Sequence, residues 1–260
     1  MCCVSKTLAA AACVALAIMA GGNSEGLAAG KAAHPPDHDW SFQGPFGTFD
    51  QAQLRRGLQV YTQVCSVCHS LKFVAYRHLD ALGFSGDEIK AIAAQKQVED
   101  GPDDNGDMFM RPARPSDIFV PPYANDNQAR AFNGGALPPD LSLITKARHG
   151  GPDYVRALLV GFEDPVPDDV ELAAGMNYNK YFTGNQIAMF APLFEGAVAF
   201  EDGTNATVEQ MAEDVVAFLA WTAEPELVDR KRIGLKTLIF LIILAGLLYA
   251  TKRKVWSDLH

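Results

Sequence analysis

The sequence predicts a mostly α-helical domain with long loops, followed by one C-terminal transmembrane helix. Apolar residues recur at helical spacing in residues 50–64 and 207–221, which favours two amphipathic helices. Residues 162–200 are rich in Gly, Pro, Asn and Asp and show no sustained periodicity, which is typical of loops. Residues 235–250 form an apolar run with one charged side chain, as a membrane-spanning helix requires. A chain of 260 residues therefore has room for one packed domain and an anchor.

The first amphipathic helix is predicted to begin at Asp50, because a carboxylate at that position can accept hydrogen bonds from the first free backbone amides. Leu54, Leu58 and Tyr61 follow at intervals of four and three residues. This spacing places the three side chains on one face of the helix, which we expect to pack into the core.

The last helix of the domain is predicted to begin at Thr207, which forms a capping-box pattern with Gln210. It ends or kinks before Pro225, because proline clashes with the preceding helical turn. Two weaker patterns predict shorter helices over residues 87–97 and 153–160.

The N-terminus has the features of a secretory signal. Lys6 provides a positive charge, residues 8–20 are small and apolar, and residues 26–30 resemble a cleavage site. The apolar run is shorter than the roughly 20 residues that a bilayer requires. We therefore expect residues 1–30 to be a cleaved signal peptide; the alternative is a buried N-terminal helix.

The apolar run near the C-terminus predicts a membrane anchor over residues 230–252. Its one charged residue, Lys236, lies in the first turn, where a lysine can extend its head group to the interface. Tyr249 and Trp256 suit the interfacial layer. The run is near the short limit for a span, so a buried core helix is the alternative reading. Basic residues flank the run on both sides: Arg230, Lys231, Arg232, Lys252, Arg253 and Lys254.

Together, the signal and the anchor predict the topology of a single-pass protein of the inner (cytoplasmic) membrane. An exported N-terminus followed by one span places residues 31–229 in the periplasm. Residues 253–260 then form a short cytoplasmic tail.

Charge is unevenly distributed along the chain. The whole sequence has a formal net charge of −9, but residues 31–229 contain 14 Lys and Arg against 29 Asp and Glu, a net charge of −15. Acidic residues concentrate in residues 163–171 and in a proline-containing segment, residues 99–122, that we expect to be a loop. Such a surface attracts cationic partners and gives no indication of nucleic-acid binding, although solubility alone is another explanation.

The most specific motif is Cys-Ser-Val-Cys-His at residues 65–69. Cys65 and Cys68 are spaced to form thioethers with the two vinyl groups of one haem, and the adjacent His69 can ligate its iron. The remaining cysteines, Cys2, Cys3 and Cys13, fall in the predicted signal. A redox dithiol lacks the following histidine and a zinc site needs two further ligands, so one covalently attached haem c is the favoured cofactor.

The second axial ligand decides whether such a haem carries electrons or binds small molecules. Met189 is favoured over Met176 because residues 187–193 around it are small and apolar; ligation by a second histidine is the remaining alternative. Arg130 is the best candidate to pair with a haem propionate, although an ordinary exposed arginine is equally compatible with the sequence. Four methionines lie in predicted loops: Met108, Met110, Met176 and Met189.

With these features placed, the chain from about residue 40 onward resembles the cytochrome c1 family of the cytochrome bc1 complex, and its bacterial members in particular. Motifs that carry the resemblance follow one another in order: residues 65–69, 135–142, 147–151, 153–155, 181–182, 187–189, 200–203, 206–207, 221–225, 230–232 and 234–236.

The resemblance implies a cytochrome c-like haem domain with His69 and Met189 as the axial ligands and Arg130 near a propionate. It also implies an electron-relay subunit that receives electrons from the Rieske iron–sulfur protein and passes them to a soluble or anchored cytochrome c. Cytochrome b and the Rieske protein would perform the quinol chemistry within a dimeric complex, so the chain by itself is not expected to be an enzyme. Two other functions remain open at this point: a free-standing anchored cytochrome c, and a haem enzyme or gas sensor with an exchangeable sixth ligand.

Overall fold

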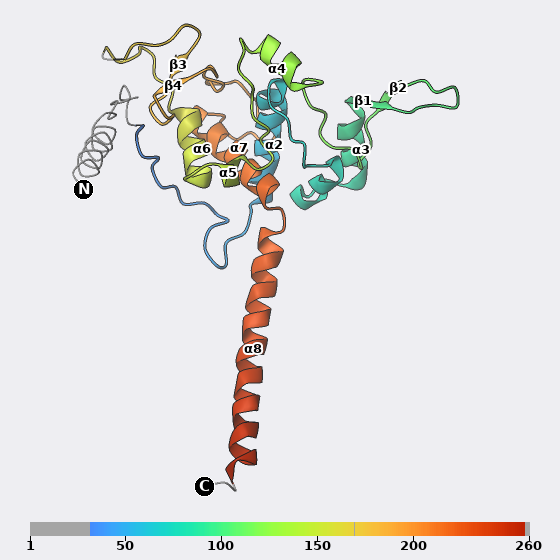
Figure 1. Ribbon diagram of the computed structural model, residues 1–260, viewed down its shortest axis with the longest axis vertical. Coiled ribbons are helices and arrows are strands. Elements are labelled where there is room, and N and C mark those ends of the chain that lie inside the picture. The colour runs from blue at the N-terminus through green and yellow to red at the C-terminus, as the bar shows by residue number, and fades with distance from the viewer. Residues whose placement is uncertain (1–31, 169, 258–260) are drawn as a thin grey trace, which may run out of the picture.

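The computed structural model describes residues 32–168 and 170–257. The predicted signal peptide therefore lies outside the described residues, as do the last three residues of the predicted tail. The described part is mostly helical, with two small two-stranded sheets, and one long helix projects from the domain (Figure 1). This architecture confirms the predicted fold class.

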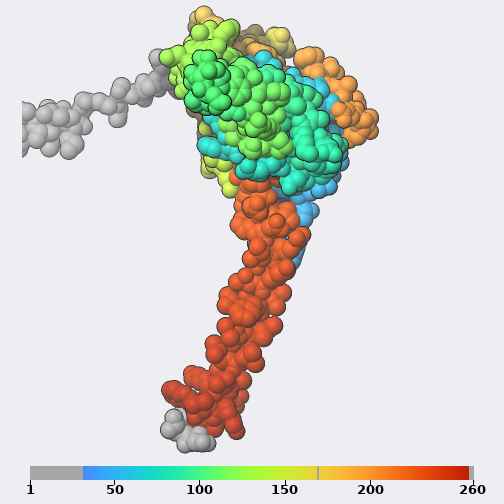
Figure 2. Space-filling model, turned by 90° about the vertical axis from the view of Figure 1, so that its right-hand side faces the viewer, coloured from blue at the N-terminus to red at the C-terminus, as the bar shows by residue number. Residues whose placement is uncertain are grey.

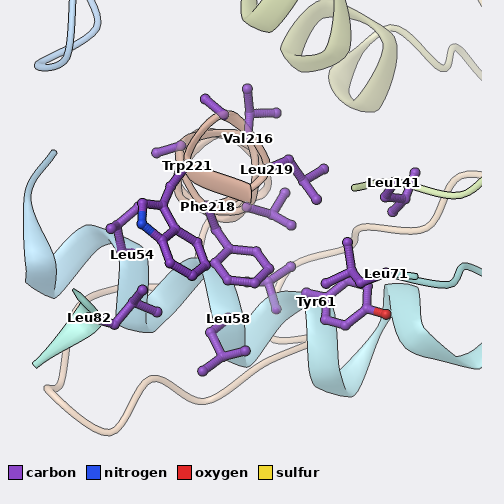
Figure 3. Close-up of a cluster of buried hydrophobic side chains, with 14 of the residues drawn as sticks. Leu54, Leu58, Tyr61, Leu71, Leu82, Leu141, Val216, Phe218, Leu219 and Trp221 are labelled. Atoms are coloured by element: carbon purple, nitrogen blue, oxygen red, sulfur yellow. The ribbon is translucent and has the colours of Figure 1, made fainter. Parts of the chain in front are cut away.

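Two helices, α2 (Gln51–Gln63) and α7 (Val208–Ala223), form the centre of the domain. Figure 3 shows α7 end-on, with Phe218 directed toward the side chains of α2. The ring centroids of Phe218 and Tyr61 are 5.9 Å apart, and Trp221 stacks on Phe218 at 5.8 Å. The two amphipathic helices predicted from the sequence are thus confirmed, and their apolar faces form the core.

The predicted caps of these helices are present, one of them in altered form. Asp50 accepts hydrogen bonds from the amides of Ala52 and Gln53, as expected. Thr207 Oγ1 accepts from the Gln210 amide at 3.1 Å, which is one half of the predicted capping box. The Gln210 side chain instead donates to a buried carboxylate of α7, because that acceptor lies one helical turn further along the chain.

A glycine allows α2 and α7 to approach closely. A Cβ atom on Gly57 would lie 2.1 Å from the carbonyl oxygen of Asp214 and 2.6 Å from Cβ of Phe218. Beside this contact, Arg56 Nε and Nη2 donate to the fully buried carboxylate of Asp214 at 2.7 and 3.1 Å. Burial raises the pKa of Asp214 and the bonds from Arg56 oppose that shift, so the ion pair favours the charged carboxylate.

One segment differs from its sequence prediction. Residues 99–122 are not wholly loop, because β1 (Gln97–Asp100) and β2 (Phe109–Pro112) form an antiparallel hairpin. Its strands are largely exposed, so they lack the apolar alternation by which a strand is recognised. The preceding helix, α3 (Gly86–Ala94), consequently ends three residues earlier than predicted.

Short elements make up the rest of the domain. Helix α6 (Gly151–Val160) confirms the predicted helix at residues 153–160 and begins two residues earlier. Residues 162–200 are largely irregular, as predicted, apart from the short pair β3 (Asn177–Tyr178) and β4 (Gln186–Ile187). Three further short helices were not predicted, because their sequences show no clear helical periodicity: η2 (Tyr76–Leu82), α4 (Asp126–Phe132) and α5 (Ile144–Ala147).

The long C-terminal helix, α8 (Leu227–Val255), has 29 residues and no buried residue. At 1.5 Å per residue it is about 43 Å long, which matches a bilayer with its head-group layers. It is long and apolar enough to cross a membrane, and its exposure excludes the alternative of a buried core helix. It extends beyond the predicted anchor, residues 230–252, at both ends.

The contact at Gly57 makes a testable prediction. Replacement Gly57→Ala should lower the free energy of unfolding by about 3 kcal/mol, because the added methyl group meets backbone atoms that cannot rotate away. Gly86→Ala is a matched control in α3, where nothing lies within 4 Å of an added Cβ, and it should change stability by no more than about 1 kcal/mol. Urea unfolding of the purified variants measures both; equal effects would contradict the proposed close packing.

Candidate haem site

The Cys-x-x-Cys-His motif forms a tight turn directly after α2. Cys65 opens a 3-10 helix, η1 (Cys65–Val67), and its carbonyl accepts from the amides of Cys68 at 3.1 Å and His69 at 2.9 Å. Both cysteines are free thiols and half-buried. Burial raises the pKa of the Cys65 thiol to about 12, so this thiol is protonated at neutral pH. The turn presents two unpaired sulfurs and an imidazole from five consecutive residues.

The imidazole of His69 is fixed by a backbone carbonyl. Its Nδ1 lies 2.8 Å from the carbonyl oxygen of Pro139. A carbonyl can only accept, so Nδ1 carries the hydrogen and Nε2 keeps its lone pair free. Burial lowers the pKa of His69 despite the opposing hydrogen bond to Pro139, which favours the neutral ring. A neutral imidazole with one oriented nitrogen is the form that ligates a metal ion.

A buried tyrosine holds the backbone of the same histidine. Tyr61, on α2, is 2% exposed and its hydroxyl donates to the carbonyl oxygen of His69 at 3.0 Å. Burial is the main cause that raises the pKa of Tyr61, so the hydroxyl remains a donor. The sequence placed Tyr61 on the apolar face of the first helix but gave no sign of this second role.

An aspartate fixes the segment that supplies the Pro139 carbonyl. Asp140 Oδ2 accepts from Ser70 Oγ and from the Lys72 amide, both at 2.8 Å, and Oδ1 accepts from the Ser142 amide at 2.9 Å. Burial acts to raise the pKa of Asp140, but these hydrogen bonds outweigh it and the pKa is lowered. The carboxylate therefore stays charged at neutral pH and joins the chain on both sides of the site.

The four candidate methionines of the predicted loops fall into two groups, on hairpins at opposite sides of the domain (Figure 1). Met108 and Met110 belong to the β1–β2 hairpin and are 55% and 61% exposed. Met176 precedes β3 and Met189 follows β4, and the pairing of Asn177 with Ile187 brings both to the same end of that sheet. Met189 is the more buried of the two, and its carbonyl accepts from the Asn177 side chain at 3.2 Å.

Arg130 lies on α4 and is exposed. Its Nη1 donates to the carbonyl oxygen of Gly135 at 3.0 Å, and the Gly135 amide donates back to the Arg130 carbonyl at 2.8 Å. Positive φ angles at Gly134 and Gly135 permit this turn, which leads to Pro139. No carboxylate within residues 32–168 and 170–257 pairs with Arg130, so its charge is available to an anionic group beside the segment that orients His69.

These donors fit a covalently bound haem. Two free thiols one turn apart can form two thioethers, and the free Nε2 of His69 can ligate iron. The part of the chain that the structure describes contains no group of three or more His, Cys, Asp or Glu side chains arranged around one point, as a structural zinc site requires. A mostly helical domain with this motif and a C-terminal helix of membrane length defines the class of membrane-anchored c-type cytochromes.

Comparison with known proteins identifies the family within this class. The model of the Cytochrome C1 family matches residues 40–259. Cytochrome c1 of Rhodospirillum rubrum is 48% identical over an alignment of 270 positions, which covers 98% of this chain and 97% of that protein. The mitochondrial cytochrome c1 haem protein of Schizosaccharomyces pombe is 50% identical, over 87% of this chain and 73% of that protein. The chain belongs to the cytochrome c1 family, which confirms the predicted family and its covalently bound haem c.

A longer protein also matches. The chain is 50% identical to the cytochrome b/c1 of Bradyrhizobium diazoefficiens over 87% of its own length, and it covers only 36% of that protein. The match therefore concerns about a third of the Bradyrhizobium protein.

The hydrogen bonds of Asp140 make a second prediction. Replacement Asp140→Asn should lower the free energy of unfolding by about 2 kcal/mol and accelerate hydrogen exchange at the amides of Lys72 and Ser142, because it removes a charged acceptor. Asp80→Asn is the control: Asp80 is exposed, and among the described residues its side chain accepts only from the neighbouring Ala81 amide, so the change should be below about 0.5 kcal/mol. Unchanged exchange at Lys72 and Ser142 would contradict the role given to Asp140.

Proposed function

We propose that the chain receives electrons from the Rieske iron–sulfur protein and passes them to a soluble or anchored cytochrome c, as the haem electron-transfer subunit of the cytochrome bc1 complex. The observation that carries this proposal is the fixed, neutral His69, with its free Nε2, on the same turn as two free thiols. In a relay, ligands that stay in place during oxidation and reduction keep the energetic cost of electron transfer low.

The proposal assigns a role to each residue of the site. Cys65 and Cys68 attach the haem, His69 and Met189 ligate its iron, and Arg130 pairs with a propionate. When bound, the haem supplies a one-electron Fe(III)/Fe(II) couple. The chain itself orients the His69 ring through Pro139 and places Met189 beside β4. A thioether that closes the sixth position favours electron transfer over the binding of small molecules.

The proposed placement in the cell follows from the two ends of the chain. Residues 1–30 are the cleaved signal, residues 31–229 form the periplasmic haem domain and residues 230–252 are the anchor in the inner membrane. Residues 253–260 remain in the cytoplasm. The exposed, apolar α8 supports the anchor. Basic residues flank the apolar run on both sides, so the orientation rests on the predicted signal rather than on these charges.

The proposed partners are cytochrome b and the Rieske protein, within a dimeric complex. The match to a Bradyrhizobium protein named cytochrome b/c1 supports cytochrome b as a partner. Quinol oxidation belongs to these partners, so the chain alone is not an enzyme. Extraction of membranes in mild detergent, followed by analysis of subunits and haem, tests the assembly: co-purification with both partners is expected, and isolation of the chain alone would contradict it.

The assignment of Met189 can be tested against its neighbour. Replacement Met189→Leu should abolish the methionine-to-iron charge-transfer band of the oxidised protein. It should also lower the reduction potential by a substantial part of the roughly 0.8 V range that axial ligands set. Met176→Leu, at the same end of the β3–β4 sheet, is the matched control and should retain the band. Loss of the band only in Met176→Leu would reverse the assignment.

The acidic surface predicts how the acceptor binds. Oxidation by a cationic cytochrome c should slow steeply between about 50 and 200 mM salt, because salt screens the attraction to the net charge of −15 on residues 31–229. Stopped-flow oxidation measures this dependence. Oxidation by anionic ferricyanide is the control and should respond in the opposite direction, since screening then removes repulsion. A flat response to salt with both oxidants would contradict electrostatic docking.

A further inference from the structure

A loop of the N-terminal segment lies beside the start of α8. The segment that precedes α2 descends on the side of the domain from which α8 emerges, and both views show it next to the first turns of that helix (Figures 1 and 2). Lys231 Nζ, in the second turn of α8, donates to the carbonyl oxygens of Phe42 at 2.7 Å and Gly47 at 3.2 Å. The loop is thus joined to the helix that can cross a membrane.

The base of this loop is anchored in the domain. Phe42 is buried and stacks on Trp40, with the ring centroids 5.5 Å apart, and the Phe49 ring lies 4.9 Å from the Phe42 ring. The indole Nε1 of Trp40 donates to Asp153 Oδ1 at 2.6 Å, which fixes the segment to α6. The position of the loop is therefore set by the core as well as by α8.

The loop is also closed upon itself. The Thr48 amide donates to the Ser41 carbonyl at 3.0 Å. Gly47 lies so close to the Gln43 carbonyl that a Cβ atom there would be 1.9 Å from its oxygen. Gly44, at φ +70°, adopts a conformation that favours glycine, and the adjacent proline restricts the chain further. A closed loop of this kind presents its tip with little loss of entropy on binding.

The tip of the loop carries an exposed apolar side chain. Phe46 is 77% exposed. Residues 40–49 contain no charged residue, although residues 31–229 as a whole carry a net charge of −15. A neutral, aromatic tip in an acidic domain avoids repulsion from anionic lipid and suits the boundary between head groups and acyl chains.

The position of the loop along α8 places it at the level of the lipid head groups. Lys231 precedes Leu235, the first residue of the apolar run, by four residues, or about 6 Å along the helix. Each head-group layer is about 5–7 Å thick. Lys231 and the two carbonyls it binds therefore lie in the head-group layer when residues 235–250 lie within the hydrocarbon core.

We propose that the loop of residues 41–48 is a second membrane contact, with Phe46 inserted among the lipids next to α8. This rests on α8 being the membrane span. Two membrane contacts resist rotation and tilt of the domain. A single helix joined to the domain by a short connection would permit both motions. The occupant of the surface is the lipid bilayer itself, and the loop holds the haem domain at a fixed orientation above it.

A photo-crosslinker at the tip tests the occupant. We expect Phe46→p-benzoylphenylalanine, irradiated in native membranes, to form lipid adducts at a yield at least tenfold above the same replacement at Phe132. Phe132 is the matched control because it is 73% exposed on α4, at the end of the domain away from α8 (Figure 1). An adduct with another protein chain, or equal lipid yields at both positions, would overturn the proposal.

Hydrogen exchange gives a second test that uses the native sequence. In nanodiscs of phosphatidylcholine and phosphatidylglycerol, the backbone amides of residues 44, 46 and 47 in the full-length chain should exchange at least tenfold more slowly than in the Phe46→Ser variant. Equal rates would overturn the proposal even if the crosslinker variant failed to fold. Release of the chain from membranes by alkaline carbonate would instead refute α8 as the anchor, so the two failures are distinguishable.

Discussion

The close approach of α2 and α7 at Gly57 is the contact on which the rest of the molecule depends. At Gly57 there is no room even for a Cβ atom between the two helices, and the ion pair of Arg56 with the buried Asp214 carboxylate lies beside this point. Helix α2 leads directly into the Cys-x-x-Cys-His turn, whereas α7 leads, after a short connection, into α8. One packing contact thus fixes the haem motif relative to the helix that anchors the domain, and a change in it would be transmitted to both.

A second set of contacts, mainly hydrogen bonds, fixes the position of His69. Tyr61 binds the carbonyl of this histidine, and the Pro139 carbonyl binds its ring. Asp140 then joins the chain after His69 to the chain after Pro139. Each of these bonds is modest alone, but the buried partners satisfy one another, so removal of one leaves a polar group without a partner. As the proposed axial ligand, His69 would thus keep its position when the charge of the iron changes.

The proposed docking of a cationic acceptor and the proposed membrane contact of residues 41–48 impose different chemical requirements on one acidic domain. Attraction of a cationic acceptor requires a negative surface, while approach to an anionic bilayer requires its absence. The sequence separates the two: residues 40–49 are free of charge, and Lys231 binds their carbonyls at the start of the anchor. If the loop holds the domain at one orientation, as proposed, the acidic surface stays accessible from the aqueous phase.

The sequence by itself determined the chemistry and the main helices. The haem motif, the cap at Asp50 and the helical spacing of Leu54, Leu58 and Tyr61 are local patterns, and local patterns are readable because each follows from a few consecutive residues. The exposed β1–β2 hairpin escaped prediction because neither of its faces is buried, and thus no alternation marks it.

Only the tertiary structure decided which distant groups meet. The pairing of His69 with Pro139, the bond from Tyr61 to the His69 carbonyl and the approach of α2 to α7 join residues by the packing of the whole domain. The same holds for Lys231 and the loop of residues 41–48, which are separated by more than 180 positions in the chain. Such contacts leave no periodic or compositional trace, because their energy depends on geometry in three dimensions rather than on neighbouring residues.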